Sequence, residues 1–302
     1  MKYIFAFEGQ GAVKPLMGKK EYETDPVFRE KLLNFAKILD INIKDILWGS
    51  RRFELRKNIF YAHVALFATG LSLFYTLIER GITPCFIVGH SLGEIIGIIA
   101  SEAISLEEGA LLVKKRGELF EEVKKSNPSD MVALIGTSEN IKQCLREFEK
   151  QGIDSVYLAN FNSPKQLVIS VSKSEISNIL PLCTKHNVRY KVLEIEVGCH
   201  SPFVQPMNKE LKEVIKSLNI RSPKCPVYST SFNEQLVDPE HIRERLIQHL
   251  LSPVKWSDSI SALINSGYRK FIEVGFSKVL KGIILDIDNQ VEVELAPNLL
   301  KK

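Results

Sequence analysis

The chain has 302 residues, of which 45% are hydrophobic and 25% are charged, enough apolar material for one large core or two unequal ones. Its 40 Lys and Arg residues against 36 Asp and Glu residues give a net charge of only +4 with no basic stripe, so we expect no nucleic-acid partner. The five cysteines have no C-x-x-C spacing, so we expect neither disulfides nor a metal site. No apolar run reaches the about 20 residues that a membrane helix needs, and we therefore expect a cytoplasmic protein that does not bind a membrane.

In the first part of the chain, short apolar runs typical of strands alternate with longer stretches in which apolar residues recur at helical spacing. Residues 3–7 predict a buried strand, and Gly9-Gln10-Gly11 predicts a tight turn directly after it. Further along, we expect a helix over 58–80, a strand over 85–88, helices over 94–100 and 106–124, and a break at 127–130.

From Met131 the pattern changes to a strand-helix-strand-strand-helix-strand order. The expected elements are strands at 131–135, 156–160, 166–170 and 189–197, and helices at 138–152 and 173–187. This order is typical of a ferredoxin-like unit. The remaining chain returns to alternating strand and helix, including a strand at 271–275. We therefore predict an α/β fold in which an α/β-hydrolase-like large domain, residues 1–128 and 199–302, carries an inserted ferredoxin-like subdomain, residues 129–198.

A serine pentapeptide lies where the predicted strand 85–88 meets a helix. Gly89-His90-Ser91-Leu92-Gly93 has the G-x-S-x-G pattern, which turns the chain sharply and exposes the serine. A serine hydroxyl becomes a nucleophile only when it is exposed and hydrogen-bonded to a base. The N–H of Leu92, at the start of the helix, is a natural donor to an oxyanion. Ser91 is thus the candidate nucleophile, although the pentapeptide alone also fits a structural turn.

Several motifs in order along the chain resemble the malonyl-CoA:acyl-carrier-protein transacylases and the acyltransferase domains of polyketide synthases. The resemblance covers nearly the whole length. The matching segments are Gly9-Gln10-Gly11, Gly89 to Glu94, Arg116-Gly117-Glu118-Leu119, Asn160 to Ser170, His200-Ser201-Pro202, Ser252 to Trp256, and Glu273-Val274-Gly275 with Lys278-Val279-Leu280.

The resemblance implies a role for several side chains around Ser91. His200 is implied as the general base. Of the histidines in the sequence it is also the best placed for this role, because it lies before a proline at the end of the predicted subdomain, where the chain is expected to return to the edge of the large sheet. Gln10 is implied as the second oxyanion donor through its backbone N–H. Arg116 is implied to pair with the carboxylate of a malonyl-type acyl group, because guanidinium offers two parallel donors; the alternative is a surface arginine in a basic run. Asn162 either shapes the pocket or forms a turn before Pro164.

Four positions depart from the family pattern. Glu8 stands where proline is usual, and we expect it to point outward, away from a malonyl carboxylate. His249 replaces a glutamine that orients the catalytic histidine, mainly through a carbonyl oxygen. Cys199, next to His200, is smaller than the phenylalanine of malonyl-type relatives, which puts strict malonyl selectivity in question. Phe276 stands where proline is usual, without a clear consequence.

The sequence supports two functions. The first is an acyltransferase that moves a malonyl-type group from coenzyme A through an acyl-Ser91 intermediate to the phosphopantetheine thiol of an acyl carrier protein, for fatty acid or polyketide synthesis. The alternative is an acyl-carrier-protein hydrolase of the same fold, which would release the acyl group to water. In both cases we expect a monomer, an acyl carrier protein as partner, and no cofactor, coenzyme A being only the carrier of the substrate.

Overall fold

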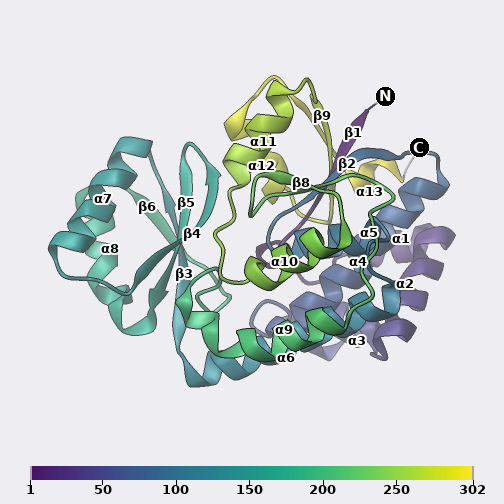
Figure 1. The fold of residues 1–302 in the computed structure, drawn as a ribbon, viewed down its shortest axis with the longest axis horizontal. Coiled ribbons are helices and arrows are strands. Elements are labelled where there is room, and N and C mark those ends of the chain that lie inside the picture. Colours follow the sequence, from purple (N-terminus) through teal and green to yellow (C-terminus); the bar gives the residue numbers. More distant parts are fainter. Residues whose placement is uncertain (1, 301–302) are drawn as a thin grey trace.

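The computed structural model describes residues 2–300 and contains two β-sheets that form two lobes (Figure 1). The larger sheet has six strands, five parallel and the last antiparallel to its neighbour. In spatial order they are β10 (Glu292–Leu295), β9 (Lys270–Val274), β1 (Tyr3–Phe7), β2 (Pro84–Gly89), β7 (Val227–Ser229) and β8 (Glu234–Leu236). Every residue of β1 from Ile4 to Phe7 is buried, as expected for a central parallel strand.

Helices cover both faces of this sheet and supply most of the core. They are α1 (Lys19–Thr24), α2 (Pro26–Leu39), α3 (Ile43–Leu47), α4 (Ile59–Glu79), α5 (Leu92–Ala100), α6 (Leu106–Ser126), α9 (Gln205–Ser217), α10 (Pro239–His249), α11 (Trp256–Asn265), α12 (Val279–Ile287) and α13 (Ala296–Leu299). Asn58 caps α4 by accepting a hydrogen bond from the N–H of Tyr61, and Gly81 ends it at a φ of 75°. Within residues 2–300, α4 alone is long and apolar enough to cross a membrane, but 83% of that stretch is buried, so α4 is a core helix.

The smaller sheet is antiparallel, with strand order β4-β5-β3-β6, and lies at the left of Figure 1 beside α7 and α8. Its elements are β3 (Ser129–Ile135), α7 (Ser138–Lys150), β4 (Val156–Ser163), β5 (Gln166–Ser172), α8 (Ile176–Lys185) and β6 (Arg189–Val192). The predicted fold class is confirmed: a large α/β part with a ferredoxin-like unit. The exact domain limits stay a prediction, and residues 1, 301 and 302 lie outside the described part of the chain.

The alternation of side chains along β3 explains how the small sheet meets the rest of the molecule. Val132 and Leu134 pack with α7 and α8, whereas Met131 and Ala133 belong to the main core on the opposite face. The backbone of β4 also pairs with the segment before α11: the N–H of Phe161 donates to Val254 O at 2.8 Å, and the N–H of Val254 donates to Ala159 O at 2.9 Å. The small lobe is therefore fastened to the large one by backbone bonds as well as by packing.

Two sequence expectations about element limits were wrong. The strand expected over 189–197 ends at Val192, and residues 193–197 continue as a loop that reaches the site described below. The break expected at 127–130 is shorter, because β3 already begins at Ser129. In both places the hydrogen bonds of β3 with β5 and β6, which are long-range, set the limits.

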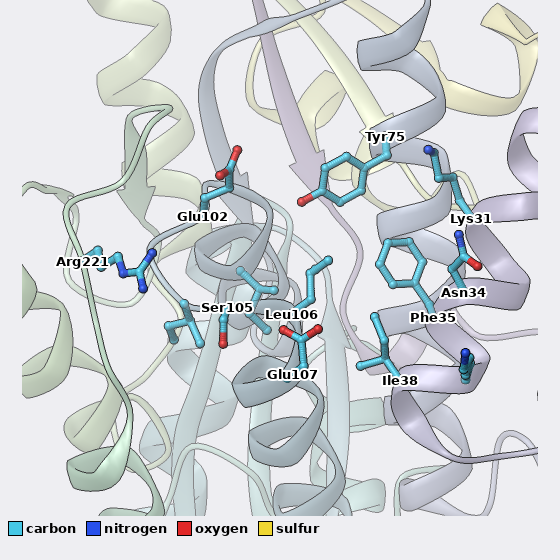
Figure 2. Close-up of a pocket in the computed structure, with 13 residues that line it drawn as sticks. Lys31, Asn34, Phe35, Ile38, Tyr75, Glu102, Ser105, Leu106, Glu107 and Arg221 are labelled. Atoms are coloured by element: carbon cyan, nitrogen blue, oxygen red, sulfur yellow. The ribbon is translucent and has the colours of Figure 1, made fainter.

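A wide groove lies on the large lobe, between α2 and the segment that leads into α6 (Figure 2). Its volume is about 920 Å³, and Phe35, Ile38 and Tyr75 form part of its wall. Its lining shares no residue with the pocket around Ser91. The groove is thus separate from the candidate active site.

Candidate active site

Ser91 sits on a strained turn between β2 and α5. Its φ is 52° and its ψ is −115°, a combination that L-residues rarely adopt, and Leu92 begins the helix. The two flanking glycines make this turn possible. A Cβ on Gly89 would lie 2.1 Å from Gly93 C, and a Cβ on Gly93 would lie 2.2 Å from Phe7 O. The pattern G-x-S-x-G is thus a steric requirement for packing this turn against β1.

His200 is hydrogen-bonded to Ser91 in the arrangement expected of a nucleophile and its base. Ser91 Oγ lies 2.7 Å from His200 Nε2, and His200 Nδ1 lies 2.7 Å from the carbonyl oxygen of Ser252. Because a carbonyl can only accept, Nδ1 carries the proton and Nε2 is free to accept the proton of Ser91. Like Ser91, His200 has a positive φ, of 57°. The chain returns to the sheet edge at His200, as the sequence indicated.

His200 is neutral at physiological pH because it is buried. Burial, followed by the charge of Arg116, lowers its pKa to about 3, while backbone hydrogen bonds to Ser252 and His249 act in the opposite direction. A base must be unprotonated before it can accept a proton. His200 is therefore ready to accept one over the whole physiological pH range.

Orientation of the base comes from the backbone, so the departure at His249 leaves it intact. The carbonyl that accepts the Nδ1–H of His200 belongs to Ser252, three residues beyond His249. The ring of His249 is buried and packs edge-on against the ring of His200, with centroids 5.6 Å apart. Its Nε2 has no hydrogen-bond partner in the described chain. Sequence reasoning missed Ser252, since a backbone acceptor can be any residue type.

The two candidate oxyanion donors, Gln10 and Leu92, each begin a helical segment, and Gln10 lines the same pocket as Ser91, the residue before Leu92. Leu92 is the first residue of α5, and Gln10 is the first residue of a 3-10 helix, Gln10–Ala12, directly after β1. N–H groups in a first helical turn have no acceptor within the helix. Gly9 lets this loop lie against the serine turn, because a Cβ there would be 2.6 Å from the carbonyl oxygen of His90. Both donors are thus held close to Ser91.

Arg116 is a buried cation without a carboxylate partner. It lies in the middle of α6, and only 1% of its surface is exposed, so the surface alternative is wrong. None of the ion pairs among residues 2–300 includes it, and its Nε has no hydrogen-bond partner there. Burial lowers its pKa to about 10. Since a buried charge is costly unless it is paired, Arg116 remains a candidate for binding an anion.

His63 supports Arg116, which the sequence did not reveal. Arg116 Nη1 lies 2.8 Å from His63 Nε2, and Phe120 packs against both groups. Burial, followed by the charge of Arg116, keeps the pKa of His63 far below its ordinary value, so its Nε2 is a neutral acceptor. Gln10 Oε1 lies 3.2 Å from the same nitrogen. The available signal was one histidine, His63, within the apolar stretch 58–80.

Asn162 links the small lobe to the serine turn. Its Oδ1 lies 2.8 Å from His90 Nε2, and its Nδ2 donates to Gln166 Oε1 at 2.7 Å. His90 in turn packs against Trp256, so it is held away from Ser91 Oγ. Asn162 lies in β4, two residues before Pro164, and also lines the pocket. It therefore fixes the residue beside the nucleophile.

The pocket around Ser91 lies between the two lobes and has a volume of about 250 Å³. The large lobe contributes the serine turn, the loop at Gln10 and the start of α12, and the small lobe contributes one face of its sheet. Cys199 lines the pocket, and burial raises its thiol pKa to about 11, so it is a neutral thiol there. Lys191 lines it too and is exposed. Within residues 2–300, no group of three or more His, Cys, Asp or Glu side chains is arranged to hold a metal ion.

Comparison with known proteins gives the family directly. A family model for the acyl transferase domain matches residues 4–298. The chain belongs to this family. The acyl transferase domain spans the described chain almost from end to end, so the resemblance seen in the sequence motifs is confirmed.

Individual relatives of this acyl transferase carry closely related names. The chain is 31% identical, over 100% of its length and 98% of the relative, to the malonyl CoA-acyl carrier protein transacylase of Bacillus subtilis. It is also 31% identical, over 95% of its length and 98% of the relative, to a polyketide biosynthesis malonyl CoA-acyl carrier protein transacylase of that organism.

Solved structures agree with the fold. The malonyl CoA-acyl carrier protein transacylase of Coxiella burnetii superimposes with a TM-score of 0.89 at 26% identity, over 100% of this chain and 97% of the other. A malonyl-transacylase solved in complex with a type II polyketide synthase acyl-carrier protein superimposes with a TM-score of 0.89 at 25% identity, over 98% of this chain and 96% of the other.

Proposed function

We propose that this protein transfers a malonyl group from coenzyme A to the phosphopantetheine thiol of an acyl carrier protein. The observation that carries the proposal is Arg116, a buried cation without a carboxylate partner, close enough to His200 to lower its pKa. A free carboxylate on the acyl group would supply the missing partner. The names of the relatives and of the solved complex support the same donor and acceptor.

The reaction follows from the positions of Ser91 and His200. Ser91 Oγ attacks the thioester carbonyl and passes its proton to His200 Nε2, and the N–H groups of Gln10 and Leu92 donate to the oxygen that becomes negative. When the tetrahedral intermediate collapses, the C–S bond breaks and His200 returns the proton to the sulfur of coenzyme A. The thiol of the carrier protein then attacks acyl-Ser91 in the same way, with His200 taking the thiol proton and returning it to Ser91 Oγ.

Pairing of Arg116 with a substrate carboxylate also strengthens the base. In the free enzyme the charge of Arg116 lowers the pKa of His200. A carboxylate beside the guanidinium cancels much of that charge, so the pKa of His200 rises when a malonyl group is bound. An acetyl group has no carboxylate and produces no such rise. The site therefore favours a carboxylated acyl group in catalysis as well as in binding.

Mass spectrometry of the intact protein tests the proposal. After incubation with malonyl-CoA, we expect a malonyl adduct that is absent in Ser91→Ala and that disappears when an acyl carrier protein with its phosphopantetheine arm is added, the malonyl group then appearing on the carrier. Rapid release of free acid from an acetyl-loaded carrier protein, with no malonyl adduct on the enzyme, would instead identify a hydrolase. Transfer is expected to take place in the cytoplasm with the protein as a monomer, and size-exclusion chromatography checks the latter.

A further inference from the structure

Glu8 does not point outward, as the sequence led us to expect; it is 2% exposed and faces a second buried carboxylate, Glu273. Glu8 follows β1 directly and precedes the oxyanion loop, Gly9–Ala12. Glu273 lies in the neighbouring strand β9, in register with Ala6. The Glu8 carboxyl leaves no room for a side chain at position 275, because a Cβ on Gly275 would lie 1.9 Å from it. Two acidic side chains are thus buried next to the oxyanion loop.

The two carboxyl groups are bound by the loop between β9 and α12. Glu8 accepts from the N–H of Phe276 at 3.0 Å and from the N–H of Ser277 at 2.7 Å, and Glu273 accepts from the N–H groups of Leu280 and Lys281 at 3.0 and 2.9 Å. Ser277 Oγ lies 2.5 Å from Glu8 and 3.2 Å from Glu273. The hydroxyl of Ser277 can donate to only one of these carboxyl groups at a time, so at the other contact two oxygens face each other unless a carboxyl group is protonated.

Among residues 2–300, none of the ion pairs includes Glu8 or Glu273. Of the titratable groups on adjoining segments, His90 faces Gly9, and Lys278 and Lys281 lie at the start of α12. Burial lowers the pKa of His90, so it is neutral. Lys278 is exposed, and the ammonium of Lys281 donates to Val293 O. The backbone N–H groups of the loop and of α12 are therefore the main donors that stabilise negative charge on these two side chains.

We propose that Glu8 stays protonated, hydrogen-bonds to Glu273 and so holds the oxyanion loop in its active position. Loss of that proton would place two negative charges in one buried site and push the loop at Gln10 away from the start of α12. Both segments line the pocket of Ser91: Gln10 on one side, Val279 and Leu280 on the other. Glu8 is thus a positioning residue that acts through Gln10, and this inference rests on the proposed acyl transfer.

The departures at Glu8 and Phe276 now explain each other. Relatives usually have proline at both positions, and a proline at 276 could not donate the N–H that Glu8 accepts. Burial, followed by the hydrogen bond to Glu273 and its charge, raises the pKa of Glu8 to about 8. The paired carboxyls should therefore make acylation sensitive to alkaline pH.

The rate of the acylation half-reaction tests this proposal. Single-turnover acylation with malonyl-CoA is measured by rapid quench between pH 6 and 9, which avoids the titration of the acceptor thiol. For the natural protein we expect the rate to fall about tenfold from pH 7 to pH 9, as for one group with a pKa near 8. Glu8→Gln cannot ionise and still donates to Glu273, so we expect its fall to be less than about twofold.

A second variant moves the transition in a defined direction. Ser277→Ala removes a hydroxyl that lowers the pKa of Glu8 while both carboxyls remain, so the alkaline loss should shift to higher pH. A role of Glu8 limited to folding would predict no such shift. If Glu8→Gln does not fold, the Glu8→Pro/Phe276→Pro double variant restores the usual residues and should also show a flat profile.

The outcomes separate this inference from the proposed function. A tenfold alkaline loss that persists in Glu8→Gln, or a natural protein whose rate does not change up to pH 9, overturns the role of the pair while acyl transfer stands. Absence of any malonyl-Ser91 at pH 7 overturns the proposed function, and the inference with it.

Discussion

Replacing Arg116 should make the protein more stable and nearly inactive with malonyl-CoA. Arg116→Met keeps a long apolar side chain against Phe120 but removes the charge. The fall in the pKa of Arg116 from its ordinary value to about 10 corresponds to about 3 kcal/mol of unfavourable free energy in the folded state. The lost hydrogen bond to His63 costs about 1–2 kcal/mol because a buried acceptor is left unpaired. We expect a net gain of about 1–2 kcal/mol in the free energy of unfolding.

The same substitution has a much larger effect of the opposite sign on catalysis. A malonyl carboxylate entering the pocket of the variant would have no cation to pair with, a loss of about 3–5 kcal/mol. We therefore expect kcat/KM for malonyl-CoA to fall about 10²–10⁴-fold. Arg116→Lys is the matched control, because it keeps the charge without the planar pair of donors and should give an intermediate loss.

Two measurements check this reasoning on Arg116. Urea unfolding gives the free energy of unfolding, and single-turnover acylation with malonyl-CoA and with acetyl-CoA gives the catalytic effect. Acetyl-CoA, which has no free carboxylate, should be affected far less by Arg116→Met. An Arg116→Met protein that is several kcal/mol less stable, or that loses acetyl and malonyl transfer equally, would refute the assignment of Arg116 as a substrate-binding cation.

Three further predictions concern the turn, the buried carboxyl pair and the base. Gly93→Ala should abolish acylation and destabilise the fold, because its Cβ would lie 2.2 Å from Phe7 O. Gly11→Ala should change little, because its Cβ would meet nothing within 4 Å. Thermal unfolding of both variants checks the effect on stability. Between pH 4.5 and about 8, Glu8 keeps a proton in the folded protein that it loses in the unfolded chain, so the free energy of unfolding should fall as pH rises. The fall should be steeper than in Glu8→Gln by up to about 1.4 kcal/mol per pH unit. Equal pH dependence of the free energy of unfolding in the two proteins, measured by urea titration, would contradict this. Because His200 has a pKa of about 3, the acylation rate should vary less than about twofold between pH 5.5 and 7, and a steep loss near pH 6.5 would show a protonating base.

The candidate site could be predicted in part because several of its features are local. The G-x-S-x-G turn needs glycines at fixed positions whatever the rest of the fold, so Ser91 and Leu92 were identified from the sequence. The two faces of β3 likewise follow from the alternation of its side chains. The alternative left open for Arg116 could not be settled in this way, because without the family resemblance the neighbouring pair of lysines favoured a solvated position. Burial depends on what packs against a helix, and the sequence of α6 alone does not contain that information.

The sequence by itself determined the order of elements, the candidate nucleophile and the family, since these depend on local patterns and on motifs in series. Tertiary structure alone decided which groups face one another. It brought the carbonyl of Ser252 to His200, the ring of His63 to Arg116, and Glu8 to Glu273 across two neighbouring strands. Each of these contacts joins residues more than 50 positions apart, so it is set by the packing of β1, β9 and the helices around them. These contacts shift the pKa values of the groups on which the proposed reaction depends.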